Sequence, residues 1–336
     1  MAPLPMPVDI VGYSDQRMVI TVTPNPSIDR TLDVAQLTPG AVNRASAVRV
    51  EPSGKGVNVT RALLRNGIGS TAVLPIGGYE GTHLGALLED AGVPYVGVPI
   101  AGAVRVNISL RGPKGVVTKV NEPGPSLSWA ESEALQDAVV SRVGRGDWVV
   151  ASGTLPGGVS ESFYADLAEA VRRRGGRFAV DSSGEALRRA LEGRPDLVKP
   201  NRTELAELVG RPLHTLGDVL EAAAQVRDLS GGVVLASLGA DGALLVDGSG
   251  IAVHAEAPVG TVRSTVGAGD SLLAGYLSVA TRSDRAGDSL AALREAVAWG
   301  SAAVRSTGSV GQRVTDAERR NVRLHQPPDP HRQLTA

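Results

Sequence analysis

The sequence contains no cysteine, which excludes disulfide bonds, thiolate catalysis and cysteine-ligated zinc or iron–sulfur centres. Aromatic residues are scarce at 3%, and no apolar run approaches the length of a membrane span. Neither sign of charge dominates, because 34 Lys and Arg face 35 Asp and Glu and the net charge is -1. We therefore expect neither a nucleic-acid-binding nor a membrane-surface protein.

Little in the sequence suggests a metal centre made of histidines or a secreted protein. The five histidines are scattered, with no close pair of the HExxH kind. The N-terminal segment has no basic region followed by a continuous apolar stretch, so we expect no signal peptide and a cytoplasmic location. Residues 1–17 and 316–336 are rich in proline or polar residues, and we expect both to be loosely ordered.

Most of the chain alternates short, apolar, β-branched runs with longer helical patterns. The pattern predicts strands at 18–24, 71–77, 147–153, 177–183, 196–201 and 232–239. Strands that are apolar on both faces are typical of a parallel sheet covered by helices on both sides. The sequence therefore predicts a doubly wound α/β fold, and without a visible linker we expect a single domain over 18–315.

Two segments, 27–50 and 104–121, alternate polar and apolar residues instead. The first is predicted as two strands around a Pro-Gly turn, and the second as a hairpin that turns at GPKG. We interpret them as a small β-sheet that projects as a lid, with a peripheral edge hairpin as the alternative. Arg105 and Asn107 face the same side of one strand and suit a phosphate or sugar hydroxyls, unless that face is simply exposed.

The carboxyl ends of the predicted strands are where an open α/β sheet binds ligands. Polar and glycine residues gather there, although ordinary turn chemistry explains each one taken alone. The turn in SLGADGALL (237–245) suits a nucleotide and equally suits a plain hairpin. The strand-end residues are Asn25, Asp29, Gly77, Gly78, Ser152, Gly153, Asp181, Asn201 and Ser237 to Gly242.

The segment EPSGKGVNVTRAL (51–63) suits an anion at a helix N-terminus. Gly54 and Gly56 allow close backbone approach, Lys55 adds a positive charge, and Asn58 lies one turn into the helix. It is not a Walker A loop, because no glycine stands five residues before Gly54 and no Ser or Thr follows Lys55. A solvated lysine in a glycine-rich turn is the alternative.

The segment STVGAGDSLLAG (264–275) combines a glycine turn with an aspartate. Leu272 stands where a dinucleotide fingerprint has its third glycine, and the segment is far from the first strand, so an oxidoreductase is not expected. Asp270 falls in the first helical turn among the amides of 267–270. Those amides suit the charge of a transferring phosphoryl group, and the carboxylate suits the proton of an attacking hydroxyl. A helix N-cap is the alternative.

Taken together, these segments resemble the PfkB family of ribokinase-like sugar kinases over residues 18–315. GKGVNV resembles its N-terminal signature and STVGAGDSLLAG its C-terminal one. TVTPNPSID, VRVNISL, VNEPGP, SGTLPGG, VDSSGEAL, LVKPNRTEL and SLGADGALL follow in the family's order. The resemblance implies a ribokinase-like fold, ATP and Mg2+ as cofactors, and a homodimer formed through the β lid.

The resemblance also implies the roles of individual residues. Asp270 would be the general base, and the amides of Gly267, Ala268 and Gly269 would form an anion hole. The phosphosugar would be held by Asp29, Gly54, Lys55, Asn58, Arg105 and Asn107. The ATP site would be lined by Asn201, Ser237, Gly239, Gly242 and Ala302. Asn201 and Glu204 would organise Mg2+ through water.

The acceptor implied by the resemblance is a sugar phosphate. Lys55 and VNEPGP resemble the branch that phosphorylates fructose 1-phosphate or tagatose 6-phosphate, whereas EPSG and VDSSGEAL also resemble minor 6-phosphofructokinases, which tend to lack that lysine. We favour conversion of fructose 1-phosphate to fructose 1,6-bisphosphate. The alternatives are a 6-phosphofructokinase, a tagatose-6-phosphate kinase, a kinase of an unphosphorylated sugar or nucleoside, and a catalytically silent regulator that binds sugar or nucleotide. The chain departs from the family at Ser53 and Gly157, where glycine and proline are usual.

Overall fold

A ten-stranded sheet runs through the centre of the computed structural model, which describes residues 17–113, 116–282, 289–306, 308 and 310–335. Its order is β14-β13-β12-β11-β10-β9-β8-β1-β4-β5. Neighbouring strands are parallel from β11 to β5, and β12, β13 and β14 extend one edge antiparallel. The strands are β1 (Val19–Val22), β4 (Ser70–Ile76), β5 (Tyr95–Pro99), β8 (Trp148–Ser152), β9 (Arg177–Asp181), β10 (Leu197–Val198), β11 (Val233–Ser237), β12 (Ala243–Val246), β13 (Ala252–Glu256) and β14 (Arg323–His325).

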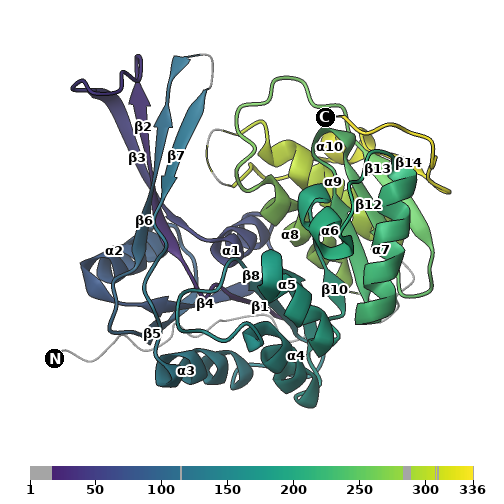
Figure 1. Cartoon of the computed structure of the whole chain (residues 1–336), viewed down its shortest axis with the longest axis horizontal. Helices are drawn as coiled ribbons and strands as arrows, with labels where there is room; N and C mark the ends of the chain where they lie inside the picture. Colours follow the sequence, from purple (N-terminus) through teal and green to yellow (C-terminus); the bar gives the residue numbers. More distant parts are fainter. Residues whose placement is uncertain (1–16, 114–115, 283–288, 307, 309, 336) are drawn as a thin grey trace.

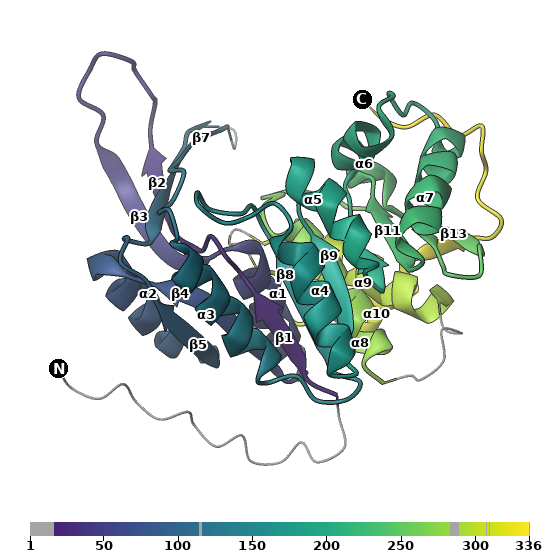
Figure 2. The same cartoon turned by 60° about the horizontal axis from the view of Figure 1, so that its bottom comes forward.

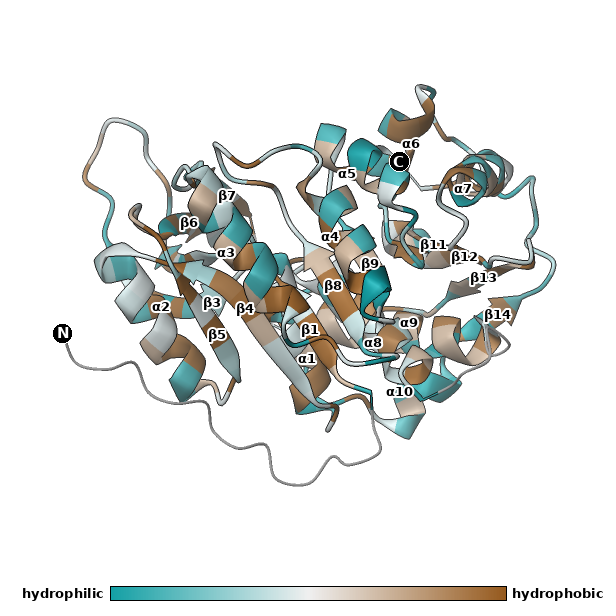
Figure 3. Ribbon diagram, turned by 90° about the horizontal axis from the view of Figure 1, so that it is seen from below, coloured by the Kyte–Doolittle hydropathy of each residue, from teal (hydrophilic) through white to brown (hydrophobic). Residues whose placement is uncertain are grey.

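Helices cover both faces of this sheet, as the apolar strands predict. Val149 and Val180 pack with α3, α4, α5, α6 and α7 on one face, whereas Val150 and Ala179 pack with α1, α8 and α9 on the other. Figure 3 shows the hydrophobic strands between these layers. The predicted doubly wound α/β fold is confirmed. The helices are α1 (Lys55–Arg65), α2 (Gly78–Asp90), α3 (Trp129–Val140), α4 (Phe163–Arg173), α5 (Gly184–Ala190), α6 (Arg202–Val209), α7 (Leu216–Ser230), α8 (Ala268–Ala280), α9 (Ser289–Ala303) and α10 (Asp316–Arg320).

A second sheet of four strands, in the order β3-β2-β6-β7, projects from this body (Figure 1). It consists of β2 (Ser27–Val34), β3 (Ala45–Ser53), β6 (Arg105–Arg111) and β7 (Val117–Asn121). The small projecting sheet predicted from 27–50 and 104–121 is therefore present, although β3 runs on to Ser53. Residues 114 and 115 of the GPKG turn lie outside the described residues. The role of this sheet as a lid remains a prediction.

The expectation of a loosely ordered stretch over 316–336 is wrong for residues 316–335. Thr315 caps α10 through a capping box with Glu318, and β14 pairs with β13. Residues 326–335 then run back over the molecule, and Gln333 forms a β-bridge with Thr215. Polar residues of this segment, which suggest disorder in the sequence, form hydrogen bonds with the rest of the molecule. Residues 1–16 and 336 lie outside the described residues.

No helix in the described part of the chain has both the length and the apolar character needed to cross a membrane.

Candidate active site

Asp270 is buried at the N-terminal end of α8, at 7% exposure. Gly267, at φ 76, is the N-cap of this helix and Asp270 is its third residue, so the alternative of Asp270 as the N-cap is wrong. The Asp270 Oδ2 instead accepts a hydrogen bond of 2.8 Å from the Asn58 Nδ2 of α1. The first N–H groups of a helix have no acceptor within it, although the Ala268 N–H reaches the Thr265 carbonyl at 3.4 Å. A carboxylate and unpaired amides therefore lie within one helical turn.

A cluster of paired charges lies beside Asp270. Asp181, fully buried at the end of β9, has the Lys55 Nζ 2.8 Å from its Oδ1 and the Lys199 Nζ 3.2 Å from its Oδ2. The Lys55 Nζ also lies 3.8 Å from the Glu204 Oε1. A Cβ placed at Gly269 would lie 3.6 Å from the Lys199 Nζ, so this ammonium group lies against the glycine turn of α8. Two cations are thus fixed at the place where the sequence predicts a phosphoryl group.

These neighbours set the protonation of the two buried carboxylates in opposite directions. Burial, followed by repulsion from Asp181, raises the pKa of Asp270 from 3.8 to about 6, although Asn58 and the two lysines lower it. Burial alone would raise the pKa of Asp181, but Lys199 and Lys55 outweigh it and the pKa is lowered. Burial also opposes the charge on Lys55, yet Asp181 and Glu204 raise its pKa. Asp270 is therefore a stronger base than an ordinary aspartate, while Asp181 stays ionised.

Asp29 forms a second group, on the small sheet. Its Oδ1 accepts hydrogen bonds from the Ser27 Oγ at 2.8 Å and the Asn107 Nδ2 at 3.0 Å, and its Oδ2 accepts one from the Ser53 Oγ at 2.8 Å. In the register of β2 and β6, Ser27 lies opposite Arg105 and Asp29 opposite Asn107. The serine at position 53 thus adds a donor that a glycine lacks, and three strands orient one carboxylate.

Several of the predicted substrate residues carry buried polar atoms that lack a hydrogen-bond partner among the described residues. They are the Asn58 Oδ1, the Arg105 Nε and the Asn107 Oδ1. The other donors of Arg105 reach the backbone carbonyls of Asn25 and Glu122, at 3.1 and 3.0 Å. Buried polar groups are nearly always paired, so the unpaired atoms of these predicted substrate residues are typical of a site that a polar ligand completes.

On the predicted nucleotide side, Asn201 caps α6 and forms a capping box with Glu204. The same Asn201 makes a β-bridge with Ser237, which ends β11. The following turn (η3, Gly239–Asp241) closes with a hydrogen bond of 2.8 Å from the Leu238 N–H to the Gly242 carbonyl. The hairpin interpretation of SLGADGALL is thus confirmed by the antiparallel pairing of β11 and β12, while its nucleotide role stays a prediction.

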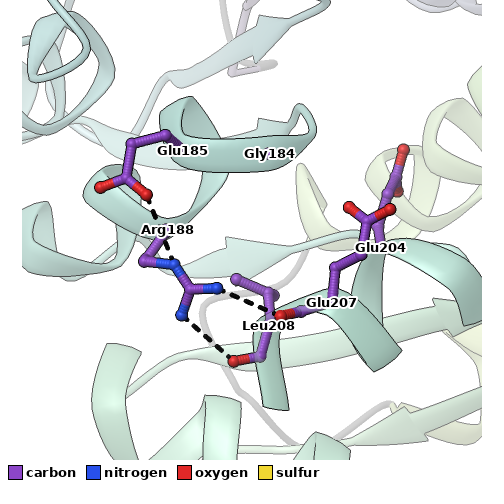
Figure 4. Close-up of a pocket in the computed structure, with 6 residues that line it drawn as sticks. All are labelled: Gly184, Glu185, Arg188, Glu204, Glu207 and Leu208. Carbon is purple, nitrogen blue, oxygen red and sulfur yellow. Dashed lines mark hydrogen bonds and ion pairs between the residues drawn. The ribbon is translucent and has the colours of Figure 1, made fainter. Parts of the chain in front are cut away.

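Glu204 lines a cavity of about 180 Å³ between α5 and α6 (Figure 4). Arg188 holds these two helices together, because it donates to the carbonyls of Glu207 and Leu208 at 3.1 and 3.3 Å. Ala302 lines a different cavity, of about 670 Å³, bounded by β3 and α1 and rich in arginine, whose lining residues do not include Ser237, Gly239 or Gly242. Direct contacts thus join Asn201, Glu204 and Ser237, while the role of Ala302 beside ATP stays a prediction.

Asp181 and Lys199 are the main residues that sequence reasoning missed as members of the site. Asp181 was visible only as one of several polar residues at strand ends, and Lys199 only as part of LVKPNRTEL. A stronger signal was available for both, because a charged side chain at the end of a strand that is buried on both faces needs a partner.

Comparison with known proteins identifies the family of the chain and supports its fold. The model of the pfkB family of carbohydrate kinases matches residues 22–315. The chain is 38% identical to the 1-phosphofructokinase of Rhodobacter capsulatus over 265 residues, which is 78% of this chain and 84% of that protein. It is 37% identical to ATP-dependent 6-phosphofructokinase isozyme 2 of Escherichia coli over 295 residues, 87% of this chain and 94% of that protein. The structure of Escherichia coli phosphofructokinase-2 in complex with substrates and products is similar, with a TM-score of 0.83 at 35% identity, covering 90% of this chain and 97% of that one.

Proposed function

Because the chain belongs to the pfkB family of carbohydrate kinases, we propose that it transfers the γ-phosphoryl group of ATP to fructose 1-phosphate, giving fructose 1,6-bisphosphate and ADP. Relatives named 1-phosphofructokinase and relatives named 6-phosphofructokinase both match most of the chain. The choice between them rests on Lys55, because the 6-phosphofructokinase branch tends to lack a lysine there.

Lys55 supports this choice through its position. It is the first residue of α1, and its ammonium group lies 2.8 Å from Asp181, in the charge cluster that also acts on Asp270. An anionic acceptor gains from a cation at this place. A kinase of an unphosphorylated sugar does not require two cations, Lys55 and Arg105, to bind its acceptor. A catalytically silent regulator does not require a buried base in the first turn of α8.

In the proposed reaction Asp270 accepts the proton of the attacking hydroxyl group, and its raised pKa suits it to do so near neutral pH. The amides of Gly267, Ala268 and Gly269 hold the charge of the transferring phosphoryl group. Asp29 orients the sugar hydroxyls, with Arg105, Asn107 and Asn58 as further contacts. Most of the rate enhancement would come from positioning and charge stabilisation, as in other phosphoryl transfers.

The residues that we propose for Mg2+ fit an ion that keeps most of its water. Asn201 and Glu204 offer oxygen atoms, the ligands that Mg2+ prefers, but each already accepts a hydrogen bond from the backbone of the other. The described residues include no cluster of three or more metal-ligating side chains. These two residues would therefore act through water, and the ion would supply charge neutralisation at the nucleotide phosphates.

The small sheet supports the further proposal of a lid that also forms a homodimer. Asp29 and Asn107 lie on one face of its strands. The other face exposes apolar residues, including Val48 on β3 and Val120 on β7, at 58% and 56% exposure. Such a face gains from being covered by a second copy. A cytoplasmic location is part of the proposal, since ATP and sugar phosphates are intracellular metabolites.

A coupled assay for ADP release tests the proposal with fructose 1-phosphate, fructose 6-phosphate and tagatose 6-phosphate in parallel. We expect the highest kcat/KM with fructose 1-phosphate, and a Lys55→Ala variant to lose most of that preference through a higher KM. A preference for fructose 6-phosphate, or an unchanged KM in the variant, contradicts the choice of acceptor. Turnover with none of the three sugars contradicts the proposal that the acceptor is one of these sugar phosphates.

A further inference from the structure

Residues 326–335, which we call the C-terminal strap, lie beyond the part of the chain that the family model matches. Figure 2 shows the strap running from β14 around α7 to end beside α6. Its backbone is tied to the start of α7 along its length. The contacts are Leu216 N–H to the Arg332 carbonyl at 2.9 Å, Gly217 N–H to the Pro330 carbonyl at 3.0 Å, and Leu334 N–H to the His214 carbonyl at 2.9 Å.

The end of the strap joins two elements of the proposed nucleotide site. The Thr335 N–H donates to the Asp241 Oδ2 at 2.8 Å, and the Thr335 Oγ1 lies 3.1 Å from the Asp241 Oδ1. The carbonyl of Thr335 accepts a hydrogen bond of 2.7 Å from Arg202. Asp241 belongs to the turn between β11 and β12, and Arg202 is the first residue of α6, directly after Asn201. Thr335 therefore uses its amide, hydroxyl and carbonyl groups to connect the turn with the helix N-terminus.

The contacts of Asp241 are of the kind that a buried carboxylate requires. The Asp241 side chain is only 8% exposed, and besides Thr335 it has the Arg332 guanidinium 3.6 Å from its Oδ1. The Asp241 carbonyl meets the Nε2 of the buried His254 at 2.7 Å. Loss of the strap would leave this carboxylate buried without its donors, which is costly, so the turn would rearrange.

Besides the strap, the backbone of the turn is held by the bond from the Leu238 N–H to the Gly242 carbonyl and by the contact of the Asp241 carbonyl with His254, but neither contact holds the Asp241 carboxylate. Gly239 and Gly242 flank Ala240 and Asp241 at φ values of +62 and +84, where glycine is the freest residue. We propose that the strap is a positioning element for ATP, which holds this turn in its binding conformation and in register with α6. The inference rests on the proposed function, because it takes this turn as the nucleotide site. Without the strap, ATP would have to order the turn on binding, and its affinity would fall.

The test compares two shortened proteins that differ by one residue. One ends at Leu334 and lacks all three contacts of Thr335, and the matched control ends at Thr335. We expect the KM for ATP to rise about tenfold in the first relative to the second, the scale expected when hydrogen bonds to a charged group are lost. The kcat and the KM for the phosphosugar should agree within about twofold, since Asp270 and Asp29 are untouched. An equal KM for ATP in the two proteins overturns the inference.

A Thr335→Val variant, which loses only the hydroxyl donor, covers the case in which the shorter protein does not fold. We expect a rise of about threefold in the KM for ATP, the effect of one such bond. Calorimetric titration with a non-hydrolysable ATP analogue separates this inference from the proposed function. If no variant turns over a phosphosugar, the proposed function fails, yet weaker analogue binding without Thr335 still supports the strap. Equal analogue binding in both shortened proteins refutes it.

Discussion

Replacement of Asp270 by asparagine should stabilise the protein while it abolishes most of the activity. Moving the pKa of this carboxyl from 3.8 to about 6 corresponds to about 3 kcal/mol against its ionised form in the folded state. Because the folded pKa is raised above the unfolded one, the contribution to stability is full below pH 4 and is lost as the pH rises through about 6. An asparagine at this position carries no charge, so its contribution to stability does not fall as the pH rises. At pH 7 we therefore expect Asp270→Asn to raise the free energy of unfolding by up to about 3 kcal/mol.

Urea denaturation followed by circular dichroism at pH 7 and at pH 4 measures this effect. The gain of Asp270→Asn should be largest at pH 7 and small at pH 4, and kcat should fall by about 10²–10⁴-fold, the scale of a lost general base. Asp181→Asn is the matched control, because Asp181 is also a buried carboxylate of the cluster but its pKa is lowered, so its loss should destabilise the protein at pH 7. The reasoning is refuted if both substitutions change stability at pH 7 in the same direction.

Two further predictions concern catalysis and binding. The pH profile of kcat/KM should fall on the acid side with an apparent pKa near 6, and Asn58→Leu should move that limb up by about one pH unit, because it removes a hydrogen bond to the ionised Asp270. The exposed Asn321→Leu is the control for this profile, and an unmoved limb in Asn58→Leu would show that another group titrates. Ser53→Ala should raise the KM for the phosphosugar about threefold to tenfold with little change in the KM for ATP, because Asp29 loses one of its donors. Steady-state kinetics beside Ser46→Ala, on the outer part of β3, checks this, and equal KM values in the two variants would contradict a role of Ser53 in orienting Asp29.

The strands of the large sheet were predictable from the sequence because their apolar pattern is local. Their spatial order was not, since β1 lies between β4 and β8 and only the crossover connections decide that arrangement. The antiparallel strands at the edge of the sheet were not all predicted, because β13 and β14 are short and half of their residues are polar. The strap was missed because the contacts that fix it on the molecule, those with His214, Leu216, Gly217, Asp241 and Arg202, are made to distant parts of the chain.

The candidate site divides along the same line. Asp270 was predictable because its glycine turn and helix are contiguous in sequence. Its raised pKa was not, because that depends on Asp181 and on burial by elements far along the chain. The pairing of Lys55 with Asp181 spans 126 residues, and no spacing rule reaches that far. Site residues that belong to one turn could be predicted from the sequence, whereas contacts between side chains on separate strands and helices became visible only in the structure.

The pairing of β2 with β6 also limits how this protein can be altered. Along each strand successive side chains point to opposite faces, so Asp29 and Asn107 share one face while Leu32 and Ile108 share the other. Inserting one residue into either strand would exchange the faces, turning the carboxylate outward and an aliphatic side chain toward the sugar. Residues 35–44, which connect β2 to β3, carry no such constraint. Insertions and deletions should therefore leave the protein active when they fall at the tip of the small sheet and inactivate it when they fall within its strands. The tip is thus the place to add a tag or a reporter.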